Sequence, residues 1–323
     1  MTQNLKDLKE GTSDVEALLT EKRVATAKNG KQYADLVFSD KTGIIKCKRW
    51  DYKEYDNLTV GGVYKLDLDI TTYQGELQGT IKQYLVLTKD PKDFVKGSRF
   101  DIETMYSEVM ARIDKFSEPM TKYIASKLME GFRESIKRAP AAKGVHNAWS
   151  GGLLEHIWSM CSYAETVVQH YQKSYGSKIS LDKVIFGLCV HDLGKVVEYT
   201  YEAGIGYAPR GVLTPHIVLG PCWVYELANK WYKETIPGSG KMPVAEFERE
   251  RDHLMHILAA HHGKGEWGSP VVPSTLEAVL VHQFDMVDSK FMHAMELVEG
   301  KEGQIPGFSE KSWSEKTQYL QYN

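Results

Sequence analysis

The chain has 323 residues, 42% of them hydrophobic and 26% charged, which is ordinary for a globular protein and enough for two hydrophobic cores. A formal net charge of −3 excludes a protein that is basic throughout. No stretch approaches the roughly 18 apolar residues of a membrane span and no apolar segment opens the chain, so we expect a cytoplasmic protein without a membrane partner.

The N-terminal part of the chain has the pattern of short β-strands separated by turns. Residues 64–70 alternate apolar and charged side chains, as a strand with one buried face does. Turn-forming residues occur at 28–31, 40–43, 60–62 and 74–75, without helical patterns between them. Short strands at this spacing favour a small β-barrel, which we place at residues 1–98.

Aromatic and basic side chains are interleaved along this predicted barrel. Residues 21–50 contain eight Lys or Arg against three Asp or Glu, so positive charge is concentrated there. In OB-fold barrels, rings stack on the bases of a single strand and cations follow its phosphates. The alternatives are that the charged run is a solvated face and that the aromatic residues belong to the core. We expect strand contacts from Tyr33, Phe38, Lys46, Lys48 and Trp50.

Beyond the barrel, from residue 102, apolar residues recur with the 3.6-residue period of a helix. One helix is predicted on each side of Pro119. The second runs towards residues 139–140, and Pro119 suits its first turn. We interpret residues 99–140 as a helical connector between the barrel and a second domain.

Residues 141–300 are predicted as an all-α domain. Its helices are expected at 153–173, 181–192, 215–234, 246–262 and 274–297. Thr214 is a candidate N-cap, with Pro215 as the first residue of its helix. Residues 301–323 are polar and are predicted to form a C-terminal tail. The expected fold class is therefore α+β, with an N-terminal barrel followed by a helical domain.

A His-Asp pair follows the most apolar of these helices. His191 and Asp192 end the apolar run 184–190, and each can place one ligand atom on a metal ion. Further candidates lie on separate predicted helices: His156, His216, His261, His262 and Asp285. A lone histidine at a helix end is more often an ordinary core or surface residue. The ordered series favours a metal site instead, and an unpaired Asp285 among apolar neighbours would be costly.

The strings around these residues resemble an HD-domain phosphohydrolase, and more narrowly the YhaM family of 3′→5′ exoribonucleases. The strings are Gly-Gly-Leu-Leu-Glu-His at 151–156, His-Asp-Leu-Gly-Lys at 191–195 and His-His-Gly-Lys-Gly-Glu-Trp-Gly-Ser-Pro at 261–270. In the barrel, residues 22–31, 39–43 and 50–51 resemble the OB domain of that family. The resemblance spans residues 18–297 in the same domain order, and it implies that residues 141–300 form an HD domain.

The resemblance also implies two ion sites that share one carboxylate. One ion would be held by His156, His191, Asp192 and Asp285, and the second by Asp192, His216, His261 and His262. A bridging carboxylate holds two cations within about 4 Å, where both can share one water and one phosphate oxygen. Histidine-rich sites with carboxylates suit Mn²⁺ or Fe²⁺ better than Mg²⁺, which prefers oxygen ligands.

Three further residues are candidate substrate contacts. The ammonium of Lys195 could face a phosphate oxygen, or it could be an exposed group near a helix C-terminus. His146 stands where the family often has paired histidines, and Val145 replaces the first of them. Arg210 is either a phosphate contact or a solvated loop residue.

The function implied by the resemblance is a metal-dependent 3′→5′ exonuclease acting on single-stranded RNA, with single-stranded DNA as a second candidate substrate. Its products would be nucleoside 5′-monophosphates, with Asp192 and Lys195 as catalytic residues. Two alternatives stay open: hydrolysis of small cyclic or polyphosphorylated nucleotides, and strand binding without catalysis. A homo-oligomer is compatible with the sequence.

Overall fold

The chain forms two compact units in a computed structural model that describes residues 2–53, 56–142, 149–201, 205–235, 242–300, 302–312 and 314–322. The first unit is Met1–Gly97 with Thr200–Gly206, and the second is Ser98–Tyr199 with Tyr207–Asn323. Strands dominate the first unit and helices the second, which confirms the predicted order of β and α structure. Among the described residues, no helix has the length and apolarity needed to cross a membrane.

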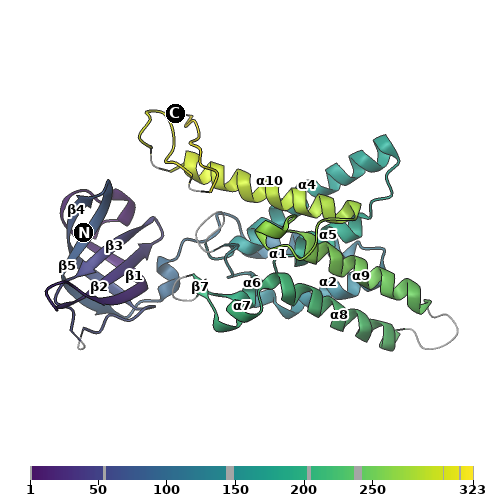
Figure 1. The fold of residues 1–323 in the computed structure, drawn as a ribbon, viewed down its shortest axis with the longest axis horizontal. Helices are drawn as coiled ribbons and strands as arrows, with labels where there is room; N and C mark the ends of the chain where they lie inside the picture. The colour runs from purple at the N-terminus through teal and green to yellow at the C-terminus, as the bar shows by residue number, and fades with distance from the viewer. Residues whose placement is uncertain are drawn as a thin grey trace. The chain divides into compact units, whose positions relative to one another are not determined.

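The first unit is a closed β-barrel (Figure 1). Its strands are β1 (Gly11–Thr26), β2 (Gln32–Asp40), β3 (Gly43–Arg49), β4 (Val63–Tyr73) and β5 (Glu76–Leu87). They follow the order β1-β2-β3-β5-β4 around the barrel. All neighbouring pairs are antiparallel except β3 and β5, which pair in parallel.

The alternating segment predicted as a half-buried strand lies in β4. Its apolar side chains, from Tyr64 to Ile70, are at most 1% exposed, whereas the charged residues between them are partly exposed. A tight turn joins β4 to β5 through Gln74 and Gly75, which both have positive φ angles of 54° and 85°. Two positive φ angles match the right-handed twist of a hairpin, so this predicted turn is confirmed.

Helices form most of the second unit. Its longer helices are α1 (Ile102–Asp114), α2 (Pro119–Gly131), α4 (Gly152–Tyr175), α5 (Leu181–Val190), α8 (His216–Thr235), α9 (Val244–Ala260) and α10 (Leu276–Val298). Pro119 occupies the first turn of α2, as predicted. The helix predicted to run from Pro119 towards residue 139 ends at Gly131, and α3 (Arg133–Ile136) follows it as a separate short helix. The sequence did not predict the short elements α6 (Lys195–Glu198), α7 (Pro209–Leu213), β6 (Tyr199–Thr200) and β7 (Gly206–Tyr207).

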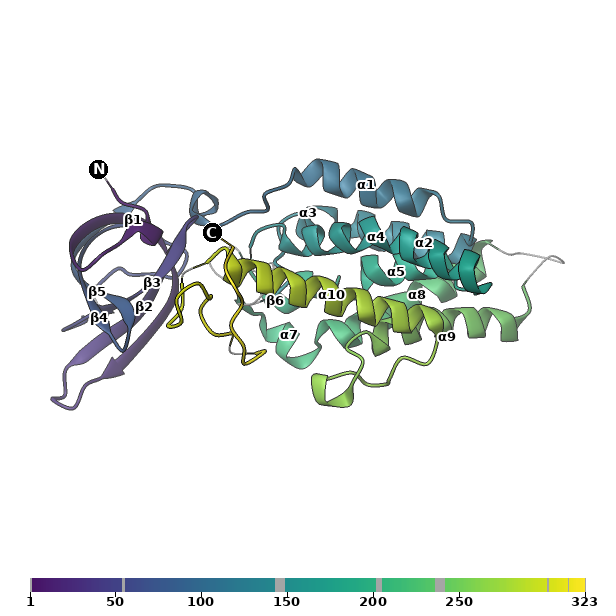
Figure 2. The same ribbon diagram turned by 90° about the horizontal axis from the view of Figure 1, so that it is seen from above.

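Helix α5 lies at the centre of this unit and contacts α1, α2, α4, α9 and α10 (Figure 2). All of its residues from Lys183 to Val190 are buried, and the Ser180 hydroxyl accepts a hydrogen bond from the Lys183 N–H at its start. Gly187 permits close packing, because a Cβ atom there would lie 2.6 Å from side-chain atoms of Ile257 and Val281. The helix that precedes the His-Asp pair is therefore held on all sides.

The stretch interpreted as a connector, residues 99–140, contributes α1 and α2 to the helical unit, where α1 packs on α4 and α2 packs on α5 and α8. The C-terminal tail folds back through isolated bridges from Glu302 to Ser309 and from Phe308 to Leu320. Ser309 and Ser312 are buried, and the Ser312 hydroxyl lies 3.0 Å from Nε2 of His293 on α10.

Candidate metal centre

Seven side chains predicted as ligands come from five separate segments of the helical unit. His156 lies on α4, His191 and Asp192 follow α5, His216 begins α8, His261 and His262 follow α9, and Asp285 lies on α10. Because α5 contacts α4, α9 and α10, residues more than a hundred positions apart meet at its C-terminal end.

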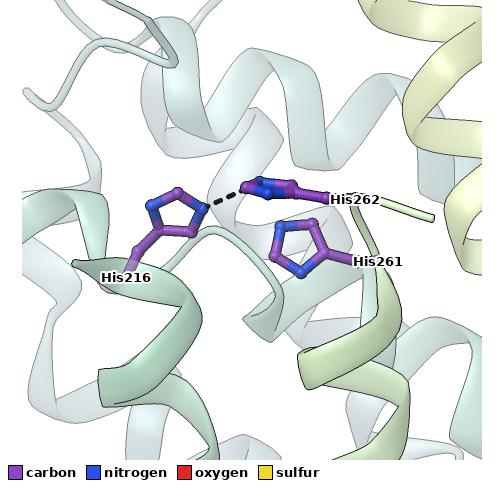
Figure 3. A group of neighbouring side chains, drawn as sticks. All are labelled: His216, His261 and His262. Atoms are coloured by element: carbon purple, nitrogen blue, oxygen red, sulfur yellow. Dashed lines mark hydrogen bonds between the residues drawn. The ribbon is translucent and has the colours of Figure 1, made fainter. Parts of the chain in front are cut away.

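The candidate ligands form two clusters, in each of which the ligand atoms lie within 4.8 Å of one another. One cluster is His156, His191 and Asp285, and the other is His216, His261 and His262. In the second, the Nε2 atoms of His216 and His262 are 3.2 Å apart, with His261 beside them (Figure 3). Three imidazole or carboxylate groups that point to one place can together bind a transition-metal ion.

Asp192 lies between the two clusters and presents one oxygen to each. Its Oδ2 is 3.4 Å from Nε2 of His191, in the first cluster. Its Oδ1 is 3.4 Å from Nε2 of His216 and 3.7 Å from Nε2 of His261, in the second. This arrangement suits a carboxylate that bridges two cations.

Two residues that follow Asp192 hold it in place. Gly194 allows the turn to lie against α8, because a Cβ atom there would be 2.6 Å from Cα of His216. The Lys195 ammonium donates to Asp192 Oδ2 at 2.6 Å and to the Ala141 carbonyl at 2.8 Å. Lys195, predicted to face a substrate phosphate, thus contacts the central carboxylate directly.

Four of the five candidate histidines present Nε2 to the centre while their Nδ1 atoms contact other groups; the exception is His262. The Nδ1 atoms of His191 and His261 donate to the carbonyls of Leu188 and Leu258. Within the described residues, the buried Nε2 atoms of these two histidines have no hydrogen-bond partner. Buried polar atoms are rarely left so, and a metal ion would satisfy both.

Electrostatics favour the protonation states that a metal needs. Burial would raise the pKa of Asp192, but Lys195, His191 and His216 outweigh it and hold the pKa well below its usual value. Burial and the neighbouring His191 lower the pKa of His261, so its imidazole is neutral. An ionised carboxylate and a neutral imidazole are the forms that bind metals.

His156 differs, because two carboxylates surround it. Burial lowers its pKa, but hydrogen bonds with Asp285 and Asp288 outweigh that effect and raise the pKa to about 10. A divalent cation can replace the proton on Nε2, the nitrogen that faces Asp285, since ligand histidines bind as neutral imidazoles. Metal binding at His156 should therefore release a proton.

Two carboxylates of the centre were not predicted. Asp288 accepts a hydrogen bond from Nδ1 of His156, and Glu198 accepts from Nδ1 of His216. Glu198 also accepts from the backbone N–H of His216, at the start of α8. The prediction of Thr214 as N-cap is wrong, because its hydroxyl donates back to the Arg210 carbonyl and α8 begins after Pro215.

Three of the residues predicted to bind a strand lie together on the barrel. The rings of Tyr33 and Trp50 are 5.4 Å apart, and the Lys48 ammonium lies 4.9 Å and 5.4 Å from their centroids. Trp50 is 50% exposed, so part of its ring is open to a ligand. Lys46 is on the same face of β3 as Lys48, where it forms an exposed ion pair with Glu76.

The prediction that Phe38 contacts the strand is wrong. Phe38 is fully buried in the barrel core, where its ring packs edge-on against Tyr64 at 6.0 Å. Side chains alternate along a strand, so Tyr33 and Phe38 on β2, five positions apart, point to opposite faces. That parity is already visible in the sequence and could have separated the two residues.

Replacing Phe38 with alanine should therefore destabilise the barrel without removing a strand contact. The cavity left by a buried phenyl ring lowers the free energy of unfolding by about 3–5 kcal/mol. Chemical denaturation followed by intrinsic fluorescence measures the loss. A variant that stays as stable as the parent but binds single strands more weakly would contradict the core assignment.

Two predicted substrate contacts remain, Arg210 and His146. Arg210 is exposed on α7, and no hydrogen bond joins its side chain to the seven candidate ligands among the described residues. His146 lies outside the described residues.

Comparisons with known proteins give one consistent result. The chain is 31% identical over 296 residues to the 3′-5′ exoribonuclease YhaM of Listeria monocytogenes serotype 4b (strain CLIP80459), covering 90% of this chain and 89% of that protein. The protein of the same name from Listeria welshimeri is 32% identical over 298 residues, with the same two coverages. That from Geobacillus sp. (strain WCH70) is 29% identical over 283 residues, covering 86% and 82%.

Other comparisons contribute less. No protein-family model matches the chain. A solved structure, the second OB-fold domain of replication protein A from Methanococcus maripaludis, is 17% identical and covers 28% of this chain and 97% of that one, with a TM-score of 0.24.

Proposed function

The chain belongs to the YhaM family of 3′-5′ exoribonucleases, and from that membership we propose that it is a metal-dependent 3′→5′ exonuclease. Its substrate would be single-stranded RNA, with single-stranded DNA as a second candidate. The observation that carries the proposal is Asp192, whose two oxygens face two separate clusters of metal-ligand side chains.

The domain assignments are part of the proposal. The barrel order β1-β2-β3-β5-β4 is compatible with an OB-fold at residues 1–98. Convergence of the His and Asp side chains at the end of α5 supports an HD domain at residues 141–300. Residues 99–140 would then supply supporting helices, and residues 301–323 a tail.

The ligand set follows from the two clusters and the carboxylate between them. One ion would be held by His156, His191, Asp192 and Asp285, and the other by Asp192, His216, His261 and His262. Ions bound there supply a water of lowered pKa and positive charge beside the reacting phosphate. The preponderance of imidazole ligands favours Mn²⁺ or Fe²⁺ over Mg²⁺.

The products follow from the proposed direction of hydrolysis. Water adds to the phosphorus of the last phosphodiester, the bond from phosphorus to the preceding 3′ oxygen breaks, and that oxygen takes up a proton. The terminal residue leaves as a nucleoside 5′-monophosphate, and the shortened strand ends in a 3′-hydroxyl. Lys195 keeps Asp192 ionised and fixed, and so contributes through the bridging carboxylate.

The barrel would hold the strand during repeated cleavage. Tyr33 and Trp50 can stack on bases, while Lys46 and Lys48 can pair with phosphates. A cytoplasmic location and a homo-oligomeric state stay predictions.

One experiment tests the proposal directly. Purified protein is incubated with 5′-labelled and 3′-labelled single-stranded RNA and DNA, with Mn²⁺ or with EDTA, and the products are resolved by length. We expect a ladder of shortened strands from the 5′ label, labelled mononucleotide from the 3′ label, and neither in EDTA. Turnover of small nucleotides without a ladder would replace the proposal by the small-substrate alternative. Strand binding without any hydrolysis would overturn it.

A further inference from the structure

Two buried carboxylates stand behind the candidate ligands, one at each cluster. In the first cluster, Asp288 Oδ2 lies 2.7 Å from Nδ1 of His156, and its Oδ1 accepts a hydrogen bond of 2.5 Å from the Ser159 hydroxyl. Asp288 is only 5% exposed. The carboxylate is thus held by two partners on α4 and faces His156 from the side opposite the proposed ion.

The second cluster has the same arrangement with a different residue. Glu198 Oε2 lies 2.6 Å from both Nδ1 and the backbone N of His216. Glu198 is also 5% exposed. It lies at the end of α6, in a different segment of the chain from Asp288 on α10. One carboxylate oxygen therefore fixes both the ring and the main chain of His216.

The Nδ1 atoms of the other three histidines have no carboxylate partner among the described residues. The Nδ1 atoms of His191 and His261 donate to neutral backbone carbonyls three residues earlier, at 3.1 Å and 2.6 Å. For His262, the buried Nδ1 has no hydrogen-bond partner among the residues that the structure describes. Each cluster therefore contains a single histidine that is backed by a negative charge.

The chemistry of the carboxylate assigns the tautomer. An ionised carboxylate can only accept hydrogen bonds, so Nδ1 of His156 and of His216 must carry the proton. The lone pair of the neutral ring is then on Nε2, which faces the cluster. A carboxylate on the far nitrogen also makes the ring a stronger ligand, and loss of such a partner typically weakens metal binding about 10- to 100-fold.

We infer that Asp288 and Glu198 are positioning residues that act independently, Asp288 on the ion held by His156 and Glu198 on the ion held by His216. The inference rests on the proposed function, because it needs both clusters to bind metal. The inference goes further because it assigns one supporting carboxylate to each ion. A mutation at one carboxylate should then weaken the binding of one ion and not of the other.

Equilibrium dialysis with Mn²⁺ tests this without relying on activity. The parent protein should bind two ions per chain. Asp288→Asn and Glu198→Gln should each keep one ion at the parent affinity and bind the other about tenfold or more weakly. Asn and Gln keep the size of the side chain, and thermal melting followed by circular dichroism checks that each variant folds. Should Asp288→Asn not fold, Ser159→Ala loosens the same carboxylate and should weaken the same ion.

The same substitutions in a variant that already lacks one ion site identify which ion is affected. Asp285→Ala removes a ligand from the first cluster alone, leaving one ion. Adding Glu198→Gln to that variant should weaken the remaining ion about tenfold, whereas adding Asp288→Asn should leave it unchanged.

Glu277→Gln is the matched control. Glu277 is a buried carboxylate on α10, like Asp288, but it accepts a hydrogen bond from the Ser180 N–H and pairs with His253. This variant should bind both ions as the parent does. If Asp288→Asn and Glu198→Gln also bind both ions normally, or if each loses both, the inference is wrong while the proposed function stands. If the parent binds no Mn²⁺, the proposed function itself fails.

Discussion

Replacing Asp192 with asparagine should lower the rate of strand shortening about a thousandfold, since bound metal ions contribute several kcal/mol of transition-state stabilisation. Asp192 has one oxygen toward each histidine cluster, so a single substitution affects both ions. An amide has one acceptor oxygen and an NH₂ group that cannot bind a cation. Rates of product formation from 5′-labelled RNA in Mn²⁺, compared with the parent, measure the effect.

The Asp192→Asn variant should still bind single-stranded RNA, because the proposed strand contacts lie on the barrel, which is a separate compact unit. Its free energy of unfolding should fall, since the largely buried Lys195 ammonium loses its ionised partner. Thermal melting therefore has to accompany the assay. A folded variant that shortens RNA within tenfold of the parent rate would remove Asp192 from the centre of the proposal.

Replacing both Tyr33 and Trp50 with alanine should weaken single-strand binding about 30-fold or more, since each base stacked on an aromatic ring contributes about 1–3 kcal/mol and two rings are removed. The KM for a long strand should rise with it, while kcat stays near the parent value, because neither ring belongs to the helical unit. Binding is measured by fluorescence anisotropy at fixed salt, as affinity for phosphates depends on ionic strength.

Tyr175→Ala provides the matched control for that double variant. Tyr175 is 73% exposed at the end of α4, in the helical unit, so its removal changes surface aromatic content without touching the barrel. It should leave both affinity and KM unchanged. Equal affinities of the double variant and the parent would show that the pair on the barrel does not stack on the strand.

The periodic parts of the fold could be predicted from the sequence. The period of two at residues 64–70 predicted a strand, and the period of 3.6 predicted the long helices of residues 141–300 to within a few residues at each end. The helix from Pro119 was predicted to run towards residue 139 but ends at Gly131. Elements of two to five residues, such as α6 and α7, were missed because one turn of helix is too short to show a period.

Five of the seven candidate ligands were predictable because they lie in recognisable strings, at 151–156, 191–195 and 261–270. His216 and Asp285 were predicted from the ordered series of His and Asp residues on separate helices. Glu198 and Asp288 were not, since each acts through a contact between segments and has no local signature. The one sequence feature that pointed to Asp288 was its position one helical turn after Asp285, on the same helix face. Thr214 was misassigned for a similar reason, as a carboxylate from another element takes the N-cap role.

The burial of α5 bears on how such an enzyme can be controlled. The His191-Asp192 pair continues from a helix that five others surround, so it cannot shift without dismantling the core. Regulation by movement of this pair alone is therefore disfavoured. We expect control of the proposed centre to act outside that core, through the supply of ions or through which RNA ends are left accessible.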